Sequence, residues 1–221
     1  MQEKDMFLKK NSFSIVFFLI TFFLKNTIYA ETKNNLIIID YLQNLDEFSA
    51  NFIQDKDGSI SEGRISIGLK RVRVDYETPS RILIILSENK GMYYNYDLDE
   101  DEFFNPADTS AGFFFNIFNN QNFFTDSKLI KKNNLLILEK KGVLEENEYK
   151  IKISFEDNPL ILRKIQLLID DDELILSIFN HNFNAKFDKN FFKLINLNFF
   201  NRWKLNFVIF RLNYKIGINF Y

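Results

Sequence analysis

Alternating apolar and polar residues run through most of the chain, and this pattern predicts an antiparallel sheet. Ile65, Ile67 and Leu69, for example, alternate with polar or small residues. A period of two places the apolar side chains on one face of a strand, so one face of the sheet is buried and the other meets water. Strands are expected at 65–70, 71–76, 82–86, 92–96, 135–138, 148–155, 161–169 and 174–179.

Two segments break this rhythm and predict helices. Residues 34–44 carry apolar residues at helical spacing. Just beyond them, Phe48 and Phe52 fit either a strand or a helix, because they lie four residues apart within an alternating segment. Residues 111–118 (AGFFFNIF) follow a possible helix cap at 108–110 (DTS). A helix this short is marginal alone, so its phenylalanines must press against an apolar surface.

The N-terminal residues predict a secretory signal. Lys9 and Lys10 precede an apolar run at 13–24, and Ala30 ends a plausible small-residue cleavage site. The run is shorter than the roughly 20 residues that span a bilayer. An uncleaved membrane anchor is the alternative. We therefore expect a mature chain, cut near Ala30, that works outside the cytoplasm.

The composition excludes several classes of site. The chain has no cysteine and one histidine, so we expect no disulfide, no thiol nucleophile and no dedicated metal site. A net charge of -2 gives no general attraction to nucleic acid or to an anionic membrane. Acidic runs at 97–102 and 170–172 are interpreted as solvated turns, because the first lacks the glycine and ligand spacing of a calcium loop.

The 27 phenylalanines, beside only 7 glycines and 3 prolines, have two interpretations. Codon bias in an A+T-rich genome would enrich phenylalanine together with asparagine, lysine and isoleucine. Alternatively, the protein needs more apolar surface than one closed core requires, as a cavity for an apolar ligand would demand. The composition alone leaves both open.

Five short segments resemble, in the same order, segments of the bacterial outer-membrane lipoprotein carrier family. The likeness covers 34–118 well, depends on the strand pattern alone from 123 to about 200, and has no counterpart at 201–221. The order of the motifs behind a secretory signal makes the resemblance specific. The segments are 41–54 (YLQNLDEFSANFIQ), 62–65 (EGRI), 73–79 (RVDYETP), 91–97 (GMYYNYD) and 106–109 (PADT).

This resemblance implies an α+β fold built on an incomplete antiparallel β-barrel, that is, a strongly curved sheet. An N-terminal helix and a short mid-chain lid helix would cover it, with an apolar cavity between them. The alternation agrees, because a curved sheet with one apolar face needs a cover. The expected organisation is a signal peptide at 1–30, a single carrier domain at 31–200 and a C-terminal extension of unknown role at 201–221.

The resemblance also implies a function. The protein would be a monomeric carrier in the periplasm of a Gram-negative bacterium, with no cofactor and no nucleic-acid partner. It would accept acylated lipoproteins from an inner-membrane ABC transporter and deliver them to an outer-membrane acceptor. The alternative is a soluble periplasmic binding protein for free lipid or another apolar ligand. An enzyme is not expected, because the lone histidine lacks a motif-placed serine or acid, and no catalytic residue is assigned.

Two sets of residues are candidates for the acyl-chain site. Each sheet residue could equally belong to an ordinary core, because the pattern does not say which face is concave. The candidate cavity residues are Ile65, Ile67, Leu69, Val72, Val74, Tyr76, Met92, Tyr94 and Tyr96. The candidate lid residues are Phe113, Phe114, Phe115, Ile117 and Phe118.

One departure from the family concerns how the lid is held. Many members carry an Arg-Pro pair at the end of the strand that follows the Gly63 position, and its arginine hydrogen-bonds to the lid backbone. Here the corresponding connection is shorter and has no proline. Lys70 or Arg71 could take the place of this arginine. The sequence does not decide which residue holds the lid closed.

Overall fold

The computed structural model describes residues 35–144 and 146–194 of the chain. The signal peptide and cleavage site expected within 1–30 lie outside these residues, as does the extension expected at 201–221. Within the described part, no helix has the length and apolar character needed to cross a membrane.

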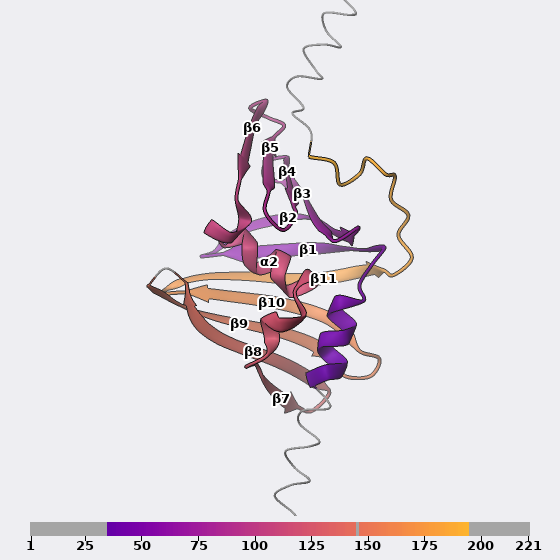
Figure 1. Ribbon diagram of the computed structural model, residues 1–221, viewed down its shortest axis with the longest axis vertical. Helices are drawn as coiled ribbons and strands as arrows, with labels where there is room; N and C mark the ends of the chain where they lie inside the picture. The colour runs from indigo at the N-terminus through magenta and orange to yellow at the C-terminus, as the bar shows by residue number, and fades with distance from the viewer. Residues whose placement is uncertain (1–34, 145, 195–221) are drawn as a thin grey trace, which may run out of the picture.

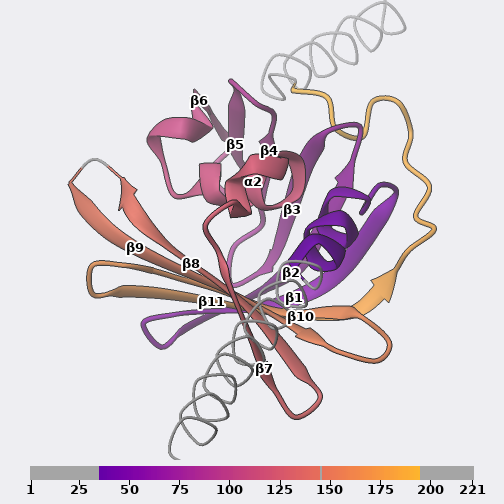
Figure 2. The ribbon, with the colours of Figure 1, turned by 60° about the horizontal axis from the view of Figure 1, so that its bottom comes forward.

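The strands of the described chain form one antiparallel, eleven-stranded sheet that curves strongly and does not close (Figures 1 and 2). The strand order is β6-β5-β4-β3-β2-β1-β11-β10-β9-β8-β7, so β6 and β7 are its edges. Pairing of β1 with β11 joins the two halves. The strands are β1 (Phe48–Lys56), β2 (Ser59–Gly68), β3 (Arg71–Thr78), β4 (Ile82–Leu86), β5 (Gly91–Asn95), β6 (Glu100–Phe104), β7 (Lys128–Lys132), β8 (Leu135–Leu144), β9 (Asn147–Glu156), β10 (Ile161–Ile169) and β11 (Asp172–Asn182).

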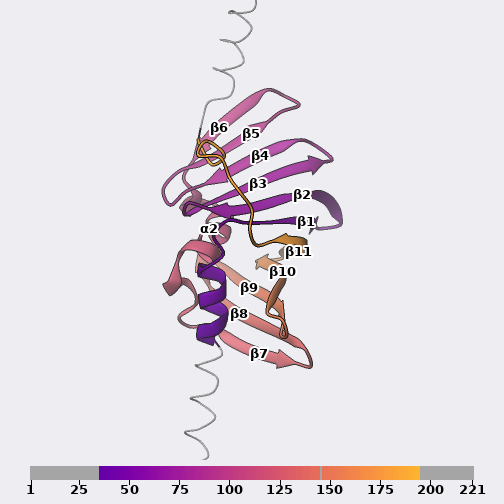
Figure 3. The ribbon, with the colours of Figure 1, turned by 90° about the vertical axis from the view of Figure 1, so that its right-hand side faces the viewer.

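The helical segments lie on one face of this sheet, called the inner face below (Figure 3). Residues 35–43, helical and drawn in indigo in Figure 1, are called helix 35–43. The mid-chain cover consists of η1 (Pro106–Asp108), α2 (Ala111–Asn119) and η2 (Gln121–Phe124). The expected α+β half-barrel with two covering helices is therefore confirmed.

One apolar cluster fills the space between the inner face and the helices. Phe48, Ala50 and Phe52, whose spacing also fitted a helix, belong to β1 and join this cluster. Neighbouring strands on both sides of β1 decide the matter, because they supply hydrogen-bond partners along its length. Ile38 and Leu42 of helix 35–43 are buried in the same cluster.

Two hairpin turns use positive φ angles and set the register of the first three strands. Asp57 and Gly58, with φ of 52° and 83°, connect β1 to β2 as the Asp-Gly pair predicts. Leu69 and Lys70, with φ of 54° and 53°, connect β2 to β3. The second turn removes Leu69 from the strand to which the alternation assigned it, and its side chain is 63% exposed.

Residues 183–194, called the strap below, follow β11 and form the orange-to-yellow loop beside the strands in Figure 1. The strap contacts Gly68 of β2 and the outward side chains of Arg71 and Arg73 of β3. Arg71 Nη1 donates to the carbonyl of Phe192 at 2.6 Å, and Arg73 Nη1 donates to the carbonyl of Phe191 at 2.7 Å. The Arg73 guanidinium also lies 4.3 Å from the centroid of the Phe191 ring. Two arginines of β3 thus fix the strap.

Candidate functional site

The lid, formed by η1, α2 and η2, begins at Pro106, whose backbone lies close to Gly112 in the first turn of α2. Asn105 Oδ1 accepts from the backbone N–H of Ala107 at 3.3 Å, which caps η1. A Cβ at Gly112 would lie 2.5 Å from the Pro106 carbonyl oxygen, so only glycine allows this approach. Ser110 occupies the N-cap position of α2, as expected for 108–110, but its side chain makes no capping hydrogen bond.

The lid helix buries most of its apolar side chains against the sheet. Phe113, Phe115, Ile117 and Phe118 are 7%, 9%, 1% and 3% exposed, whereas Phe114 is half-buried. These four side chains share the inner-face cluster with residues of β2 and β3. The predicted short helix and its need for an apolar surface are therefore confirmed, and the helix covers the open side of the curved sheet.

Five of the nine candidate cavity residues face this lid. Ile65 and Ile67 on β2 and Val72 and Val74 on β3 are buried in the cluster that holds the lid phenylalanines. Tyr76 packs at the edge of the same cluster, and its hydroxyl donates to Gln54 Oε1 at 2.8 Å. Burial raises the pKa of Tyr76 to about 12, so this phenol stays neutral.

The other four candidates do not face the lid, and this part of the expected grouping is corrected. Leu69 lies in the β2–β3 turn, and Tyr96, 40% exposed, follows β5. Met92 and Tyr94 are buried, but in a second cluster with Leu83 and Ile85.

The reason is the phase of the pleat across two strands. Val72 pairs with Leu86, and Leu86 pairs with Gly91, so the inward positions of β5 are Gly91, Tyr93 and Asn95. The tyrosine-rich run looked like an inner-face strand because tyrosine is partly apolar. The sequence of β4 is an unbroken apolar run and does not show which of its residues point inward. Only the pairing of β4 with β3 and β5 decides which residues of β5 face the lid.

A glutamine of helix 35–43, rather than an arginine, contacts the lid backbone. Gln43 Nε2 donates to the carbonyl oxygen of Ile117 at 3.2 Å. Arg71 points to the outer face, where it bonds to the strap. The expectation that Arg71 could take the place of the family arginine at the lid is therefore wrong. Lys70 borders a hollow beside α2 but makes no side-chain hydrogen bond with any described residue of the lid.

Three further aromatic residues contact the lid or belong to it. Phe124 of η2 is 2% exposed, and Phe123 lies beside it with ring centroids 4.9 Å apart. Tyr149 of β9 meets Phe113 with ring centroids 4.7 Å apart. The Phe123-Phe124 pair follows the lid helix directly and could have been read as its continuation. Nothing in the local pattern distinguishes Tyr149 from any other inward residue of β9.

The hollows along this site lie at the edges of the lid. A groove of about 820 Å³ runs between helix 35–43 and η2, lined by Leu36, Ile37, Ile39 and Phe124 among others. A more polar hollow of about 570 Å³ lies between α2 and the hairpin turns at Lys70 and Glu88. Neither is lined by the inward residues of β2 or β3. Lid side chains therefore occupy the space in which a ligand is expected.

The space between the lid and the sheet is lined mainly by apolar side chains. Among residues 35–144 and 146–194, no three His, Cys, Asp or Glu side chains come together in a group that could hold a metal ion. What the arrangement offers is aliphatic and aromatic surface, covered by a short helix with one side-chain hydrogen bond from helix 35–43.

Comparisons with known proteins identify a family. The family model described as outer membrane lipoprotein carrier protein LolA matches residues 43–195. A search of curated proteins finds no match.

The solved structures that resemble this chain do so at low sequence identity and with TM-scores below 0.5. An uncharacterized conserved protein from Thermus thermophilus has 9% identity and a TM-score of 0.48, covering 73% of this chain and 94% of that one. MucB in the Pseudomonas aeruginosa MucA/MucB complex has 12% identity and a TM-score of 0.44, covering 72% of this chain and 60% of that one. LprF from Mycobacterium bovis has 8% identity and a TM-score of 0.36, covering 68% of this chain and 90% of that one.

Proposed function

Because this chain belongs to the outer membrane lipoprotein carrier protein LolA family, we propose that it is a periplasmic carrier for lipoproteins. It binds their acyl chains between the lid and the inner face of the sheet. It takes them from an inner-membrane ABC transporter and delivers them to an outer-membrane acceptor. The carrier acts as a monomer after removal of residues 1–30 and catalyses no reaction.

The observation that carries this proposal is the way the lid closes. Four large apolar side chains of one short helix are buried against the same sheet face. An acyl chain exposed to water costs about 0.8 kcal/mol per CH₂. If the lid swings away, the chain covers the sheet surface that the phenylalanines leave. Lid and lipid thus exchange similar apolar contacts, which keeps binding reversible enough for onward transfer.

The lid contact with Gln43 fits reversible opening. A neutral side-chain hydrogen bond contributes only about 0.5–1.5 kcal/mol. An uncharged glutamine also holds the lid independently of salt, unlike an ion pair. We propose that Gln43 takes the part that the family arginine plays elsewhere. The acyl-chain lining is proposed to be Ile65, Ile67, Val72, Val74 and Tyr76, facing Phe113, Phe114, Phe115, Ile117 and Phe118.

Binding of a fluorescent fatty-acid probe tests the proposal and separates it from the alternative. The purified protein should take up the probe, and a triacylated lipopeptide should displace it at lower concentration than free fatty acid does. Displacement that favours the free fatty acid would indicate the alternative, a periplasmic binding protein for free lipid. A protein that takes up no probe at all would contradict both functions.

A further inference from the structure

The polar hollow beside α2 runs along one side of the lid helix. Gly112, Phe115, Asn116 and Asn119 of α2 border it, and they recur at the spacing of three or four residues that places side chains on one side of a helix. From Gly112 to Asn119 the helix rises about 10 Å, at about 1.5 Å per residue. An extended peptide advances about 3.3 Å per residue, so this stretch matches roughly three residues of such a peptide.

Phe115 places the hollow next to the proposed acyl-chain site. The residue is 9% exposed and belongs to the cluster between the lid and the inner face, yet it also borders the hollow. Its neighbour Asn116 is half-buried and polar. The lid surface therefore changes from apolar to polar within one residue. A ligand whose acyl chains lie under the lid would meet these polar groups with the part that follows the chains.

Side-chain carboxamides supply hydrogen-bonding groups of both kinds to the hollow. Asn116 Oδ1 accepts from Asn120 Nδ2 at 3.2 Å, and Asn119 Nδ2 donates to the carbonyl of Phe115 at 3.1 Å. In the described part of the chain, no hydrogen bond is made by the Asn116 amino group, the Asn119 side-chain oxygen or the Gln121 carboxamide. Donors and acceptors thus remain for a ligand that offers both, as peptide groups do.

The opposite wall of the hollow carries one charge of each sign. Lys70 lies in the β2–β3 turn and Glu88 in the β4–β5 turn, and both border the hollow. Neither forms an ion pair with a described residue. Two opposite charges give little net attraction for an anion such as a phosphate. Uncharged ester and peptide groups therefore suit this wall better.

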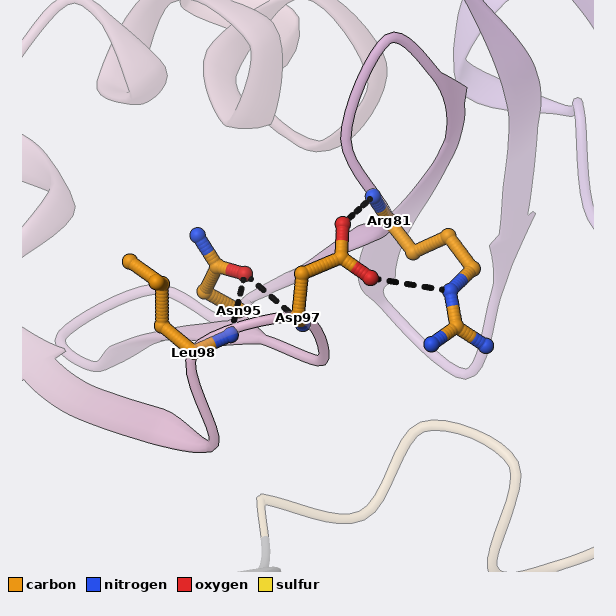
Figure 4. Close-up of polar contacts among 4 residues, drawn as sticks. All are labelled: Arg81, Asn95, Asp97 and Leu98. Atoms are coloured by element: carbon orange, nitrogen blue, oxygen red, sulfur yellow. Dashed lines mark hydrogen bonds and ion pairs between the residues drawn. The ribbon is translucent and has the colours of Figure 1, made fainter.

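The β4–β5 hairpin that carries Glu88 is fixed at both ends. At the turn, the backbone N–H and the hydroxyl of Ser87 donate to the carbonyl of Lys90 at 2.9 and 2.8 Å. At the other end, the Asp97 carboxylate accepts from the backbone N–H of Arg81 at 3.0 Å and from its Nε at 3.1 Å (Figure 4). Movement of α2 away from the sheet would therefore widen the hollow against a fixed wall.

The groove at the other edge of the lid suits a peptide less well. Leu36 and Ile37, which are 61% and 52% exposed, form its wall together with Ile39 and Phe124. These apolar side chains offer no hydrogen-bond partners to a peptide backbone, whose N–H and C=O groups would lose water without replacement. The two edges of the lid thus differ in the kind of ligand group that they accept.

We propose that the hollow beside α2 holds the polar end of a lipoprotein, namely the ester groups of its acylated cysteine and about three residues that follow. The proposal rests on lipoprotein binding at the lid and adds the direction in which the cargo lies. The acyl chains lie under the lid, and the peptide leaves between α2 and the turns at Lys70 and Glu88. Its backbone bonds to the carboxamides of Asn116, Asn119 and Gln121.

Photo-crosslinking tests this direction. The probe is a synthetic triacylated cysteinyl peptide that carries a diazirine on the residue directly after the cysteine. It is added to the purified full-length protein and irradiated, and mass spectrometry of the digest locates the attachment. We expect attachment at residues around the hollow, such as Ala107, Asn116 and Asn120. Attachment at Leu36 or Ile37 would place the peptide in the groove and overturn the inference, as would attachment spread evenly over the surface.

A matched pair of variants tests the carboxamides. Asn116→Ala lies within α2, where alanine favours the helix, so the fold should be kept. It should weaken binding of the triacylated peptide about threefold or more, because a hydrogen bond is lost, and leave the affinity for free fatty acid unchanged. Asn122→Ala makes the same substitution on the groove side of the lid and should change neither affinity. Equal affinities of the two variants for the triacylated peptide would overturn the inference.

The results also separate this inference from the proposed function. If the protein does not bind the triacylated peptide, both carriage of lipoproteins and the role of the hollow are wrong. If it binds the triacylated peptide but attachment occurs away from the hollow, only the direction proposed for the cargo is wrong.

Discussion

Gln43 Nε2 donates to the carbonyl oxygen of Ile117 across the gap between helix 35–43 and the lid. On the other side of the helix, the Tyr41 hydroxyl accepts from the backbone N–H of Leu162 on β10 at 3.3 Å. Helix 35–43 is thus bonded to the sheet through one residue and to the lid through another. This arrangement makes the helix the support against which the lid opens.

Replacement of Gln43 by alanine should loosen the lid. The lost hydrogen bond predicts a decrease of about 0.5–1.5 kcal/mol in the free energy of unfolding. The same variant should take up a fluorescent fatty-acid probe faster, since less free energy opposes opening. Stopped-flow fluorescence measures that rate. Asn44→Ala, directly after this helix, is the control, because among the described residues the Asn44 side chain bonds to Asp40 of the helix and not to the lid. Equal rates for both variants would remove Gln43 from lid control.

A charge on the lid should weaken lipid uptake. Phe114 is the half-buried phenylalanine of α2, so Phe114→Asp can fold while it presents a carboxylate to the bound acyl chain. Desolvation of that carboxylate predicts a dissociation constant for the probe at least about tenfold higher. Asn120→Asp, at the exposed end of the lid, adds the same charge and keeps a residue type that caps η2. A titration in which both variants bind equally would contradict the role of the lid face.

The packing of the closed lid can be tested through stability. Phe118 is 3% exposed, and Phe118→Ala should lower the free energy of unfolding by about 3–5 kcal/mol, as deletion of a buried ring does. Urea denaturation measures the loss. A change below about 1 kcal/mol would mean that the lid does not pack on the sheet in solution.

The strap contact predicts a loss of stability when the arginine fork is removed. Arg73, whose side chain is 18% exposed, bonds to Asp75 and to the Phe191 carbonyl. Arg73→Lys cannot make both contacts in the same geometry and should lower the free energy of unfolding by about 1.5–3 kcal/mol. Arg64→Lys, an exposed arginine of β2, should change it by less than about 0.5 kcal/mol. Equal denaturation midpoints for the Arg73→Lys and Arg64→Lys variants would mean that the strap contact does not stabilise the fold.

The lone histidine predicts a pH dependence of stability. Burial lowers the pKa of His181, although its ring contacts the carbonyl of Leu162 at 2.6 Å. The unfolded chain therefore binds a proton at higher pH than the folded chain does. Stability is full above the ordinary histidine value of about 6.5 and decreases as the pH falls through the folded value. His181→Gln should flatten this part of the profile, whereas an unchanged profile would assign the effect to carboxylates.

The sequence predicted the class of fold because the strand pattern is long and regular. Period-two alternation places Ile65 with Ile67, and Val72 with Val74, on one face of their own strands. The pairing of β2 with β3 then brings the two pairs together in the inner-face cluster. The short aromatic helix was equally readable, since eight consecutive residues with so few charges cannot remain in water.

The parts that failed depend on relations between segments. Met92 and Tyr94 were assigned to the wrong face because the phase of β5 is set by its pairing with β4, not by its own residues. Arg71 was considered for the lid, but it points to the outer face because it alternates with Val72, and the strap that it meets is 121 residues away in sequence. The contact of Gln43 with Ile117, 74 residues apart, has no local signal either.

The central claim is that this protein carries acylated lipoproteins. Native mass spectrometry of the protein, isolated from the periplasm of its own cells without detergent, tests it most directly. We expect a population whose added mass, on dissociation, is a protein with an acylated N-terminal cysteine. Recovery of the protein with free lipid alone, or with no apolar ligand, would contradict carriage of lipoproteins.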